Sequence, residues 1–156
     1  MQLSIGSKAP AFSLPDQDGK IHSLAECAGK RVLLYFYPKD DTEGCTKQAC
    51  AIQGTLPNFM KFDITVFGIS VDSVQSHAKF AEKYGLSFTL LSDETKEVVE
   101  KYGVWGTKKF MGREYMGTAR TSFLINPEGV IEKIYENVKP ETHAAEVLAD
   151  IANAGK

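Results

Sequence analysis

Residues 31–50 read RVLLYFYPKDDTEGCTKQAC. The apolar run over residues 31–37 is rich in valine, leucine and aromatic side chains, which is typical of a buried strand. Pro38 ends this run, and a polar loop follows it. A helix is expected from about Cys45 toward Leu56. The stretch therefore predicts a strand, a loop and a helix, which is the repeating unit of α/β folds.

The remaining segments continue this alternation of strands and helices. The Pro-Asp-Gln-Asp-Gly turn at residues 15–19 predicts an N-terminal β-hairpin, and Pro57 is expected to end or kink the first helix. Strands separated by helices favour parallel neighbours, whereas hairpins add antiparallel strands. The sequence thus predicts a three-layer α/β fold with a central mixed sheet flanked by helices. Further strands are expected over residues 64–71, 88–91, 121–125 and 130–135, further helices over 73–84, 93–102 and 140–153, and a flexible flap over 105–116.

Length and composition limit the classes to which the chain can belong. The 156 residues fit one domain, and a hydrophobic content of 43% is enough to build a core without disulfides. Mixed charge with a net charge of −2 argues against a disordered chain and against a nucleic-acid partner. The longest apolar stretch is far shorter than a membrane span, and the N-terminus shows no secretory signal. We therefore expect a single domain over residues 1–156 in the reducing cytoplasm, with no membrane partner.

The cysteines carry the chemical information in this chain. Cys45 lies in the first turn of the expected helix, where free N–H groups and the helix dipole stabilise a thiolate, the nucleophilic form of cysteine. Cys50 follows five residues later, and on a wound helix the two Cα atoms would lie about 8.7 Å apart on different faces. A disulfide needs Cα atoms within about 7 Å of each other. Cys45 and Cys50 can therefore bond only if the first turns of the helix unwind.

Taken alone, the Cys-x4-Cys pair leaves three interpretations open: ordinary helix residues, a redox couple, or part of a metal site. A metal site is disfavoured because His22, His77 and His143 are widely scattered and the sequence has no second cysteine pair. A thioredoxin-like dithiol would need a Cys-x-x-Cys motif, which the sequence lacks. We expect no metal and no cofactor, and we interpret the leftover Cys27 as a small buried residue.

The spacing Pro38-x-x-x-Thr42-x-x-Cys45 resembles the peroxidatic motif of the peroxiredoxins. The flanking Leu-Tyr-Phe-Tyr-Pro-Lys and Gly-Cys-Thr-x-x-Ala-Cys segments resemble the bacterioferritin comigratory protein, or peroxiredoxin Q, branch of that family. The resemblance covers nearly the whole chain in collinear order, and it implies that the three-layer architecture is thioredoxin-like. Four further blocks carry it, over residues 12–19, 88–93, 102–106 and 120–125.

The resemblance implies a thiol-dependent peroxidase and suggests a role for individual residues. Cys45 is similar to the peroxidatic cysteine, whose thiolate attacks a hydroperoxide and becomes a sulfenic acid. Thr42 would direct its hydroxyl at the peroxide oxygens, although threonine is also a common helix N-cap. Pro38 would shield the thiolate from water, and Arg120, at the start of a predicted strand, would supply a permanent cation. Gln48 stands where many relatives carry an acid, and we expect it to alter only the local field of the helix.

Cys50 resembles the resolving cysteine of this branch. It would attack the sulfenic acid and form a Cys45–Cys50 disulfide, which thioredoxin or a similar dithiol donor would reduce. The implied substrates are hydrogen peroxide and organic hydroperoxides, and the implied assembly is a monomer. Two other functions stay open: a peroxide-responsive redox sensor, in which the disulfide alters partner binding, and a holdase chaperone, which would need high-order assembly.

Overall fold

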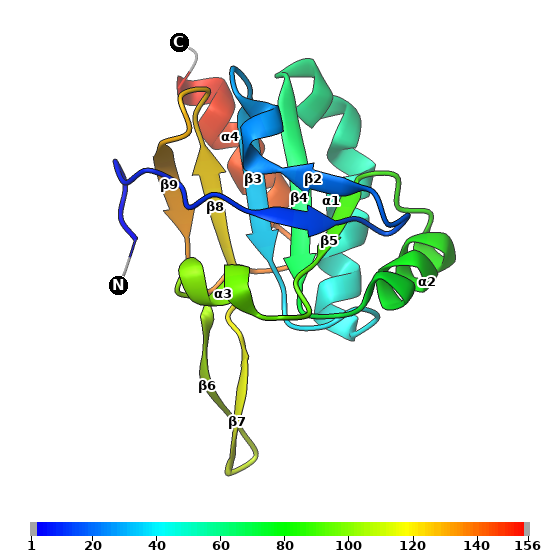
Figure 1. Cartoon of the computed structure of the whole chain (residues 1–156). Helices are drawn as coiled ribbons and strands as arrows, with labels where there is room; N and C mark the ends of the chain where they lie inside the picture. Colours follow the sequence, from blue (N-terminus) through cyan, green and yellow to red (C-terminus); the bar gives the residue numbers. More distant parts are fainter. Residues whose placement is uncertain (1–2, 155–156) are drawn as a thin grey trace.

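A five-stranded sheet forms the centre of the computed structural model, which describes residues 3–154 (Figure 1). Its strands are β3 (Arg31–Phe36), β4 (Ile64–Ser70), β5 (Thr89–Ser92), β8 (Thr121–Ile125) and β9 (Ile131–Tyr135). They lie in the order β5-β4-β3-β8-β9. β3, β4 and β5 run parallel, whereas β8 is antiparallel to β3 and β9 is antiparallel to β8. The predicted mixed sheet is confirmed.

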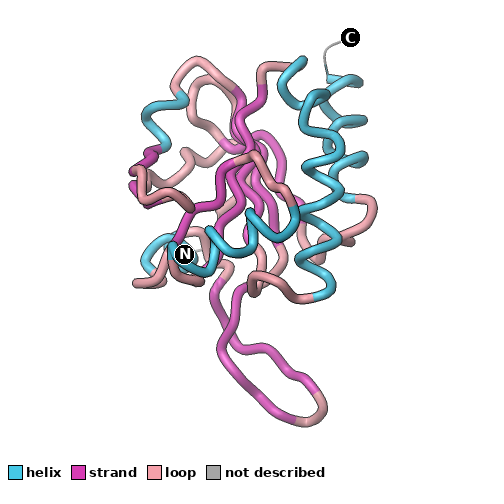
Figure 2. The backbone as a smooth tube through the Cα atoms, turned by 90° about the vertical axis from the view of Figure 1, so that its right-hand side faces the viewer, coloured by secondary structure: helices cyan, strands magenta, loops and turns pink. Residues whose placement is uncertain are grey.

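Long helices cover one face of the sheet, and the N-terminal segment with two short helices covers the other (Figure 2). Successive residues of a strand point to opposite faces. Leu33 and Tyr35 of β3 therefore join the core beneath the long helices, whereas Val32 and Leu34 join the second core. Burial on both faces explains why β3 reads as an unbroken apolar run. The first face carries α1 (Glu43–Lys61), α2 (Val74–Tyr84) and α4 (His143–Ala154), and the second carries β1 (Ser13–Pro15), β2 (Ile21–Ser23), the 3-10 helix η1 (Leu24–Cys27) and α3 (Glu97–Lys101).

Local signals in the sequence set the ends of several elements. β1 and β2 pair antiparallel across the turn at 15–19, which confirms the N-terminal hairpin. The Ser73 side chain caps the start of α2, and Gly85 ends this helix in the left-handed region with φ 65°. α3 is shorter than predicted and begins only at Glu97, because Lys96 has a left-handed backbone with φ 67° that a continuing helix excludes.

α1 is longer than the predicted helix. It begins at Glu43 and continues through Pro57 to Lys61, so our expectation that this helix ends near Leu56 is wrong. Proline removes one helical hydrogen bond, which costs about 3 kcal/mol in a helix interior. Burial of Phe59 beyond the proline anchors the last turns to the core and offsets this loss. None of the described helices, α1 included, is long and apolar enough to cross a membrane.

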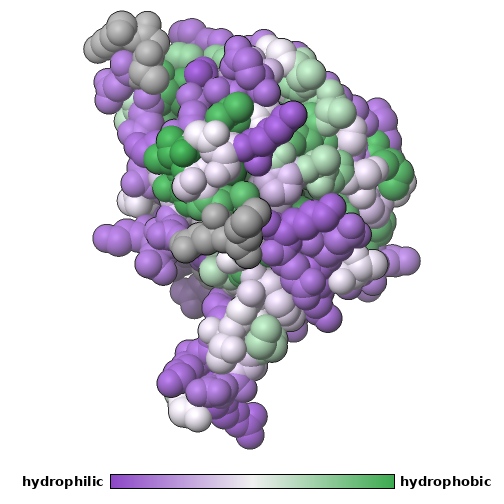
Figure 3. Space-filling model, turned by 60° about the vertical axis from the view of Figure 1, so that its left-hand side comes forward, coloured by the Kyte–Doolittle hydropathy of each residue, from purple (hydrophilic) through white to green (hydrophobic). Residues whose placement is uncertain are grey.

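Residues 105–118 form a regular β-hairpin where we expected a flexible flap. β6 (Trp105–Phe110) and β7 (Arg113–Thr118) pair antiparallel, and the hairpin projects from the body of the protein (Figure 1). Met111 and Gly112 have φ values of 52° and 78°, and positive φ at both turn residues is typical of a type I′ hairpin turn. β7 is largely exposed, and the visible hairpin surface ranges from hydrophilic near its tip to near-neutral closer to the body of the protein (Figure 3). The hairpin therefore lacks the hydrophobic alternation from which strands are predicted.

Candidate active site

The motif residues lie where β3 ends and α1 begins. The backbone amide of Tyr37 donates to the Ile69 carbonyl at 3.1 Å and so extends the contact of β3 with β4 by one residue. The loop over residues 38–42 then leads the chain into α1. Cys45, in the first turn of this helix, is only 2% exposed and packs in the core beneath it. The N–H groups of that turn and the positive end of the helix dipole favour an anionic sulfur at this place.

The two cysteines of α1 face different surroundings. Cys45 is buried and Cys50 is exposed, and both are free thiols on an intact helix. This agrees with the expectation that thiols at this spacing stay unbonded while the helix is wound. Cys27 is buried at the end of η1, and burial raises the pKa of its thiol. A raised pKa disfavours the reactive thiolate, in line with the interpretation of Cys27 as a small buried residue.

Thr42 occupies the N-cap position of α1. Its carbonyl accepts the Thr46 amide at 2.8 Å, whereas its hydroxyl donates to the Lys39 carbonyl at 2.9 Å. The side chain thus braces the loop instead of capping the helix, so capping does not explain why a threonine stands here. Pro38, half-buried, begins the same loop directly after Tyr37.

Arg120 reaches this loop from the neighbouring strand. β8 runs antiparallel to β3, and their register pairs Phe36 with Thr121, so the start of β8 meets the end of β3. Nη2 of Arg120 lies 3.0 Å from the point that a Cβ on Gly44 would occupy. The glycine directly before Cys45 therefore gives the guanidinium room against the first turn of α1. The structure thus sets the predicted cation against the helical turn that holds Cys45.

Gln48 takes part in this site more directly than we expected. It is 1% exposed, and its Oε1 accepts a hydrogen bond from Nη1 of Arg120 at 2.8 Å. Its Nε2 is buried and has no hydrogen-bond partner among residues 3–154. Gln48 follows Cys45 by three positions, which places both side chains on one face of the helix. That spacing was visible in the sequence, but the contact with Arg120 depends on how β8 packs.

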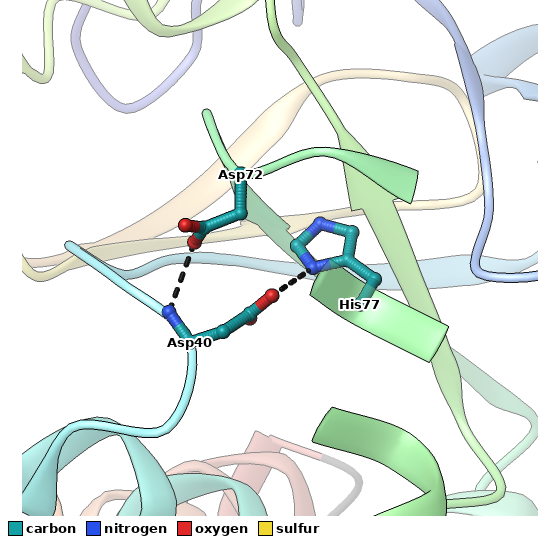
Figure 4. A group of neighbouring side chains, drawn as sticks. All are labelled: Asp40, Asp72 and His77. Atoms are coloured by element: carbon teal, nitrogen blue, oxygen red, sulfur yellow. Dashed lines mark hydrogen bonds and ion pairs between the residues drawn. The ribbon is translucent and has the colours of Figure 1, made fainter. Parts of the chain in front are cut away.

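A buried hydrogen-bond network fastens the loop to α2 and to the end of β4 (Figure 4). The Asp40 carboxylate accepts hydrogen bonds from the Tyr37 hydroxyl at 2.6 Å and from the Ser76 hydroxyl at 2.8 Å. Nδ1 of His77 lies 2.6 Å from the same carboxylate. The backbone amide of Asp40 donates to the Asp72 carboxylate at 2.9 Å. The loop is therefore held through both its backbone and its side chains, which orients the start of α1.

Three members of this network, Asp40, Asp72 and His77, also bring potential metal ligands within 4.8 Å of one another. Nε2 of His77 lies 2.9 Å from the Leu91 carbonyl, so it must carry the hydrogen and donate it. Nδ1 and Asp40 then share a proton. Asp72 also accepts from the Ser70 hydroxyl at 2.6 Å. Hydrogen bonds within the protein thus account for these three side chains. The structural role of His77 was not predicted from the sequence, where His77 is only one of three scattered histidines.

Two aromatic rings form the sheet side of the site. Burial raises the pKa of Tyr35 and of Tyr37 well above the usual phenol range, so both hydroxyls stay protonated. Negative charge on Cys45 adds to the shift at Tyr35, which places this ring near the thiol. The two rings stack with centroids 5.4 Å apart. Cys45 therefore shares one buried cluster with two neutral rings.

Comparisons with known proteins identify the family of this chain. Residues 5–134 match the AhpC/TSA family. The chain is 49% identical to a putative peroxiredoxin bcp of Coxiella burnetii, over 95% of this chain and 98% of the relative. It is also 49% identical to peroxiredoxin Bcp of Escherichia coli K12, over 94% of each chain.

Solved structures extend the likeness to the fold. A cysteine-to-serine mutant of PrxQ from Xylella fastidiosa superposes with a TM-score of 0.94 at 30% identity, covering 100% of this chain and 99% of that one. The bacterioferritin comigratory protein of Xanthomonas campestris superposes with a TM-score of 0.87 at 34% identity, covering 93% and 92%. The thioredoxin-like fold is thereby confirmed. The chain belongs to the AhpC/TSA family and, within it, to the Bcp/PrxQ peroxiredoxins, which are thiol peroxidases.

Proposed function

We propose that Cys45 is the peroxidatic cysteine of this peroxidase. Its thiolate attacks the terminal oxygen of hydrogen peroxide or an organic hydroperoxide, so that an S–O bond forms as the O–O bond breaks. The leaving oxygen takes up a proton and departs as water or alcohol, and Cys45 is oxidised to a sulfenic acid. The observation that carries this proposal is the approach of Arg120 to Gly44, which sets a permanent cation against the turn that holds Cys45.

Three other residues complete the proposed site. Arg120 stabilises the thiolate and the charge that develops on the leaving oxygen. Thr42 lies at the N-terminal end of α1. Its hydroxyl can give up its hydrogen bond to the Lys39 carbonyl and donate to a peroxide oxygen instead. Pro38 lies between the buried strand and the exposed loop, and it limits the access of water to the thiolate.

Cys50 is proposed as the resolving cysteine. Its sulfur attacks the sulfur of the Cys45 sulfenic acid, the S–S bond forms, and hydroxide leaves and is protonated to water. Cys50 is exposed and Cys45 is buried, so the first turns of α1 must unwind before the two sulfurs meet. An exposed disulfide is accessible to a dithiol reductant, for which thioredoxin has the right chemistry. A reducing compartment such as the cytoplasm, a monomer and a single domain over residues 1–156 belong to this proposal.

The proposal is tested by adding one equivalent of hydrogen peroxide and mapping the thiols by mass spectrometry. A Cys45–Cys50 disulfide is expected in the wild type, a Cys45 sulfenic acid in Cys50→Ser, and no rapid oxidation in Cys45→Ser. Cys27→Ser is the matched control and should behave as wild type. Continued turnover by Cys45→Ser with thioredoxin, its reductase and NADPH would overturn the assignment. Slow turnover with a large oxidation-dependent change of shape would favour the redox sensor instead.

A further inference from the structure

Lys108 of β6 runs toward the base of the hairpin instead of into solvent. Its Nζ donates to the carbonyl of Thr118, the last residue of β7, at 2.8 Å. Its Cδ lies 2.8 Å from the point that a Cβ on Gly117 would occupy. The lack of a side chain at Gly117 therefore gives the aliphatic part of Lys108 the space in which it lies. The next residue, Lys109, points the other way, is 77% exposed and pairs with Glu114 at 3.6 Å. The Lys108 ammonium is therefore held by the backbone at the base of the hairpin, whereas that of Lys109 lies in solvent.

The Lys108 ammonium shares the neighbourhood of Arg120 and Cys45. Thr118, which holds the ammonium, precedes Arg120 by two residues, and Arg120 lies against Gly44 beside Cys45. Burial and the positive charge of Arg120 lower the pKa of Lys108, whereas negative charge on Cys45 raises it. The contact of Lys108 with Thr118 and that of Arg120 with Gly44 thus place both cations at the end of the hairpin that adjoins the first turn of α1.

Neither cation has an acidic partner among the residues that the structure describes. Within residues 3–154, no ion pair joins Lys108 or Arg120 to a carboxylate, although exposed lysines such as Lys83 and Lys109 form such pairs. Nη1 of Arg120 meets the neutral amide of Gln48 instead. Two like charges that are partly withdrawn from water repel each other, and a nearby anion relieves this cost. The thiolate of Cys45 is an anion at the right place.

We propose that Lys108 is a second cation of the Cys45 site: a positioning residue that, with Arg120, stabilises the thiolate and links the β6–β7 hairpin to the reactive helix. Lys108 acts through Cys45 and not on the substrate. The effect of Lys108 on peroxide reduction rests on the proposed function of Cys45. Its effect on thiolate formation does not, because the thiolate can be measured without peroxide.

The test is the pH dependence of iodoacetamide alkylation at Cys45, followed by mass spectrometry of the Cys45 peptide. Lys108→Met should move the midpoint to higher pH and slow alkylation about three- to tenfold below it, because a half-exposed cation supplies part of the stabilisation of a nearby anion. All proteins should alkylate at one rate at high pH. Lys108→Arg should restore the profile, and Lys109→Met, which removes the adjacent exposed charge, should match wild type.

Lys108→Gln provides a second test, because the amide keeps a donor for the Thr118 carbonyl and removes only the charge. A shifted midpoint in Lys108→Gln supports the proposal even where Lys108→Met disturbs the hairpin. A wild-type profile in folded Lys108→Gln overturns it. Rapid oxidation of Cys45 by peroxide together with unshifted alkylation would leave the proposed function standing and remove this inference. If the alkylation midpoint shifts but peroxide does not oxidise Cys45, this inference would stand and the proposed function would fall.

Discussion

Arg120 donates a 2.8 Å hydrogen bond to Oε1 of Gln48, so the guanidinium meets a neutral amide in a buried position. A neutral acceptor orients the cation without cancelling its charge. The full positive charge of Arg120 therefore remains available to an anion on Cys45, which precedes Gln48 by one helical turn.

Gln48→Glu should weaken this effect. A carboxylate at the same place would pair with Arg120 and offset its charge, leaving less stabilisation for the Cys45 thiolate. We expect the rate constant for Cys45 oxidation by hydrogen peroxide to fall about three- to tenfold at pH 6 and to recover at higher pH. Asn58→Asp, which adds the same charge at the exposed far end of α1, is the control. Equal rates for Gln48→Glu and wild type across the pH range would contradict this reading of the pair.

Gly44→Ala should separate activity from stability. The new Cβ would meet Nη2 of Arg120 at 3.0 Å and displace the guanidinium, while alanine is a better helix residue than glycine. Peroxide reduction should fall about tenfold, the cost of losing part of an electrostatic contact. The free energy of unfolding in urea should change by less than about 1 kcal/mol.

Gly54→Ala is the matched substitution on the same helix. No atom lies within 4 Å of its Cβ position among the described residues, so we expect about 0.5–1 kcal/mol of stabilisation and unchanged activity. Full activity in Gly44→Ala would show that peroxide reduction does not depend on the position of the Arg120 guanidinium beside residue 44.

Asp40→Asn should loosen the loop that orients α1. The amide would leave donors of Tyr37, Ser76 or His77 without their anionic acceptor in a buried site, and an unsatisfied buried group costs about 1–3 kcal/mol. We expect a lower urea midpoint and slower oxidation of Cys45. Asp41→Asn alters a more exposed carboxylate of the same loop, which bonds Lys83 and Tyr84 of α2, and it should have a clearly smaller effect on both measurements. Equal losses for the two variants would show that the buried network has no special part in holding the loop.

Stability should fall in mild acid because of His143. Burial lowers the pKa of this histidine below its ordinary value of 6.5, although Glu146 opposes the shift. Below about pH 6.5, His143 therefore binds a proton in the unfolded chain more readily than in the native protein. The free energy of unfolding decreases as the pH falls.

His143→Gln should lack this loss while keeping a group that can reach the Ser122 hydroxyl, 2.8 Å from Nε2 of the histidine. The stability advantage of wild type over His143→Gln, measured by urea unfolding, should therefore shrink between pH 7 and pH 5. Curves that stay parallel over this range would exclude His143 as a cause of acid sensitivity.

Local patterns in the sequence determined much of this protein. The apolar run of β3, the Ser73 cap and Gly85 stop of α2, and the turn at 15–19 each act within a few residues, so they are readable without a structure. The same holds for the Cys45–Cys50 spacing, because helix geometry alone keeps the two Cα atoms too far apart. These signals were sufficient to predict the three-layer fold and the helix start at Cys45, whereas a peroxidatic role for this cysteine came from the family resemblance.

Only the tertiary structure decided which distant groups meet Cys45. Arg120 and Gln48 touch because β8 lies beside β3, and His77 holds the loop because α2 packs against the same end of the sheet. The passage of α1 through Pro57 has the same origin, since burial of Phe59 outweighs a local rule. Periodicity and spacing act along the chain, whereas these contacts depend on strand order, register and packing. No window of sequence contains that information, because the energy of each contact belongs to residues brought together only by folding.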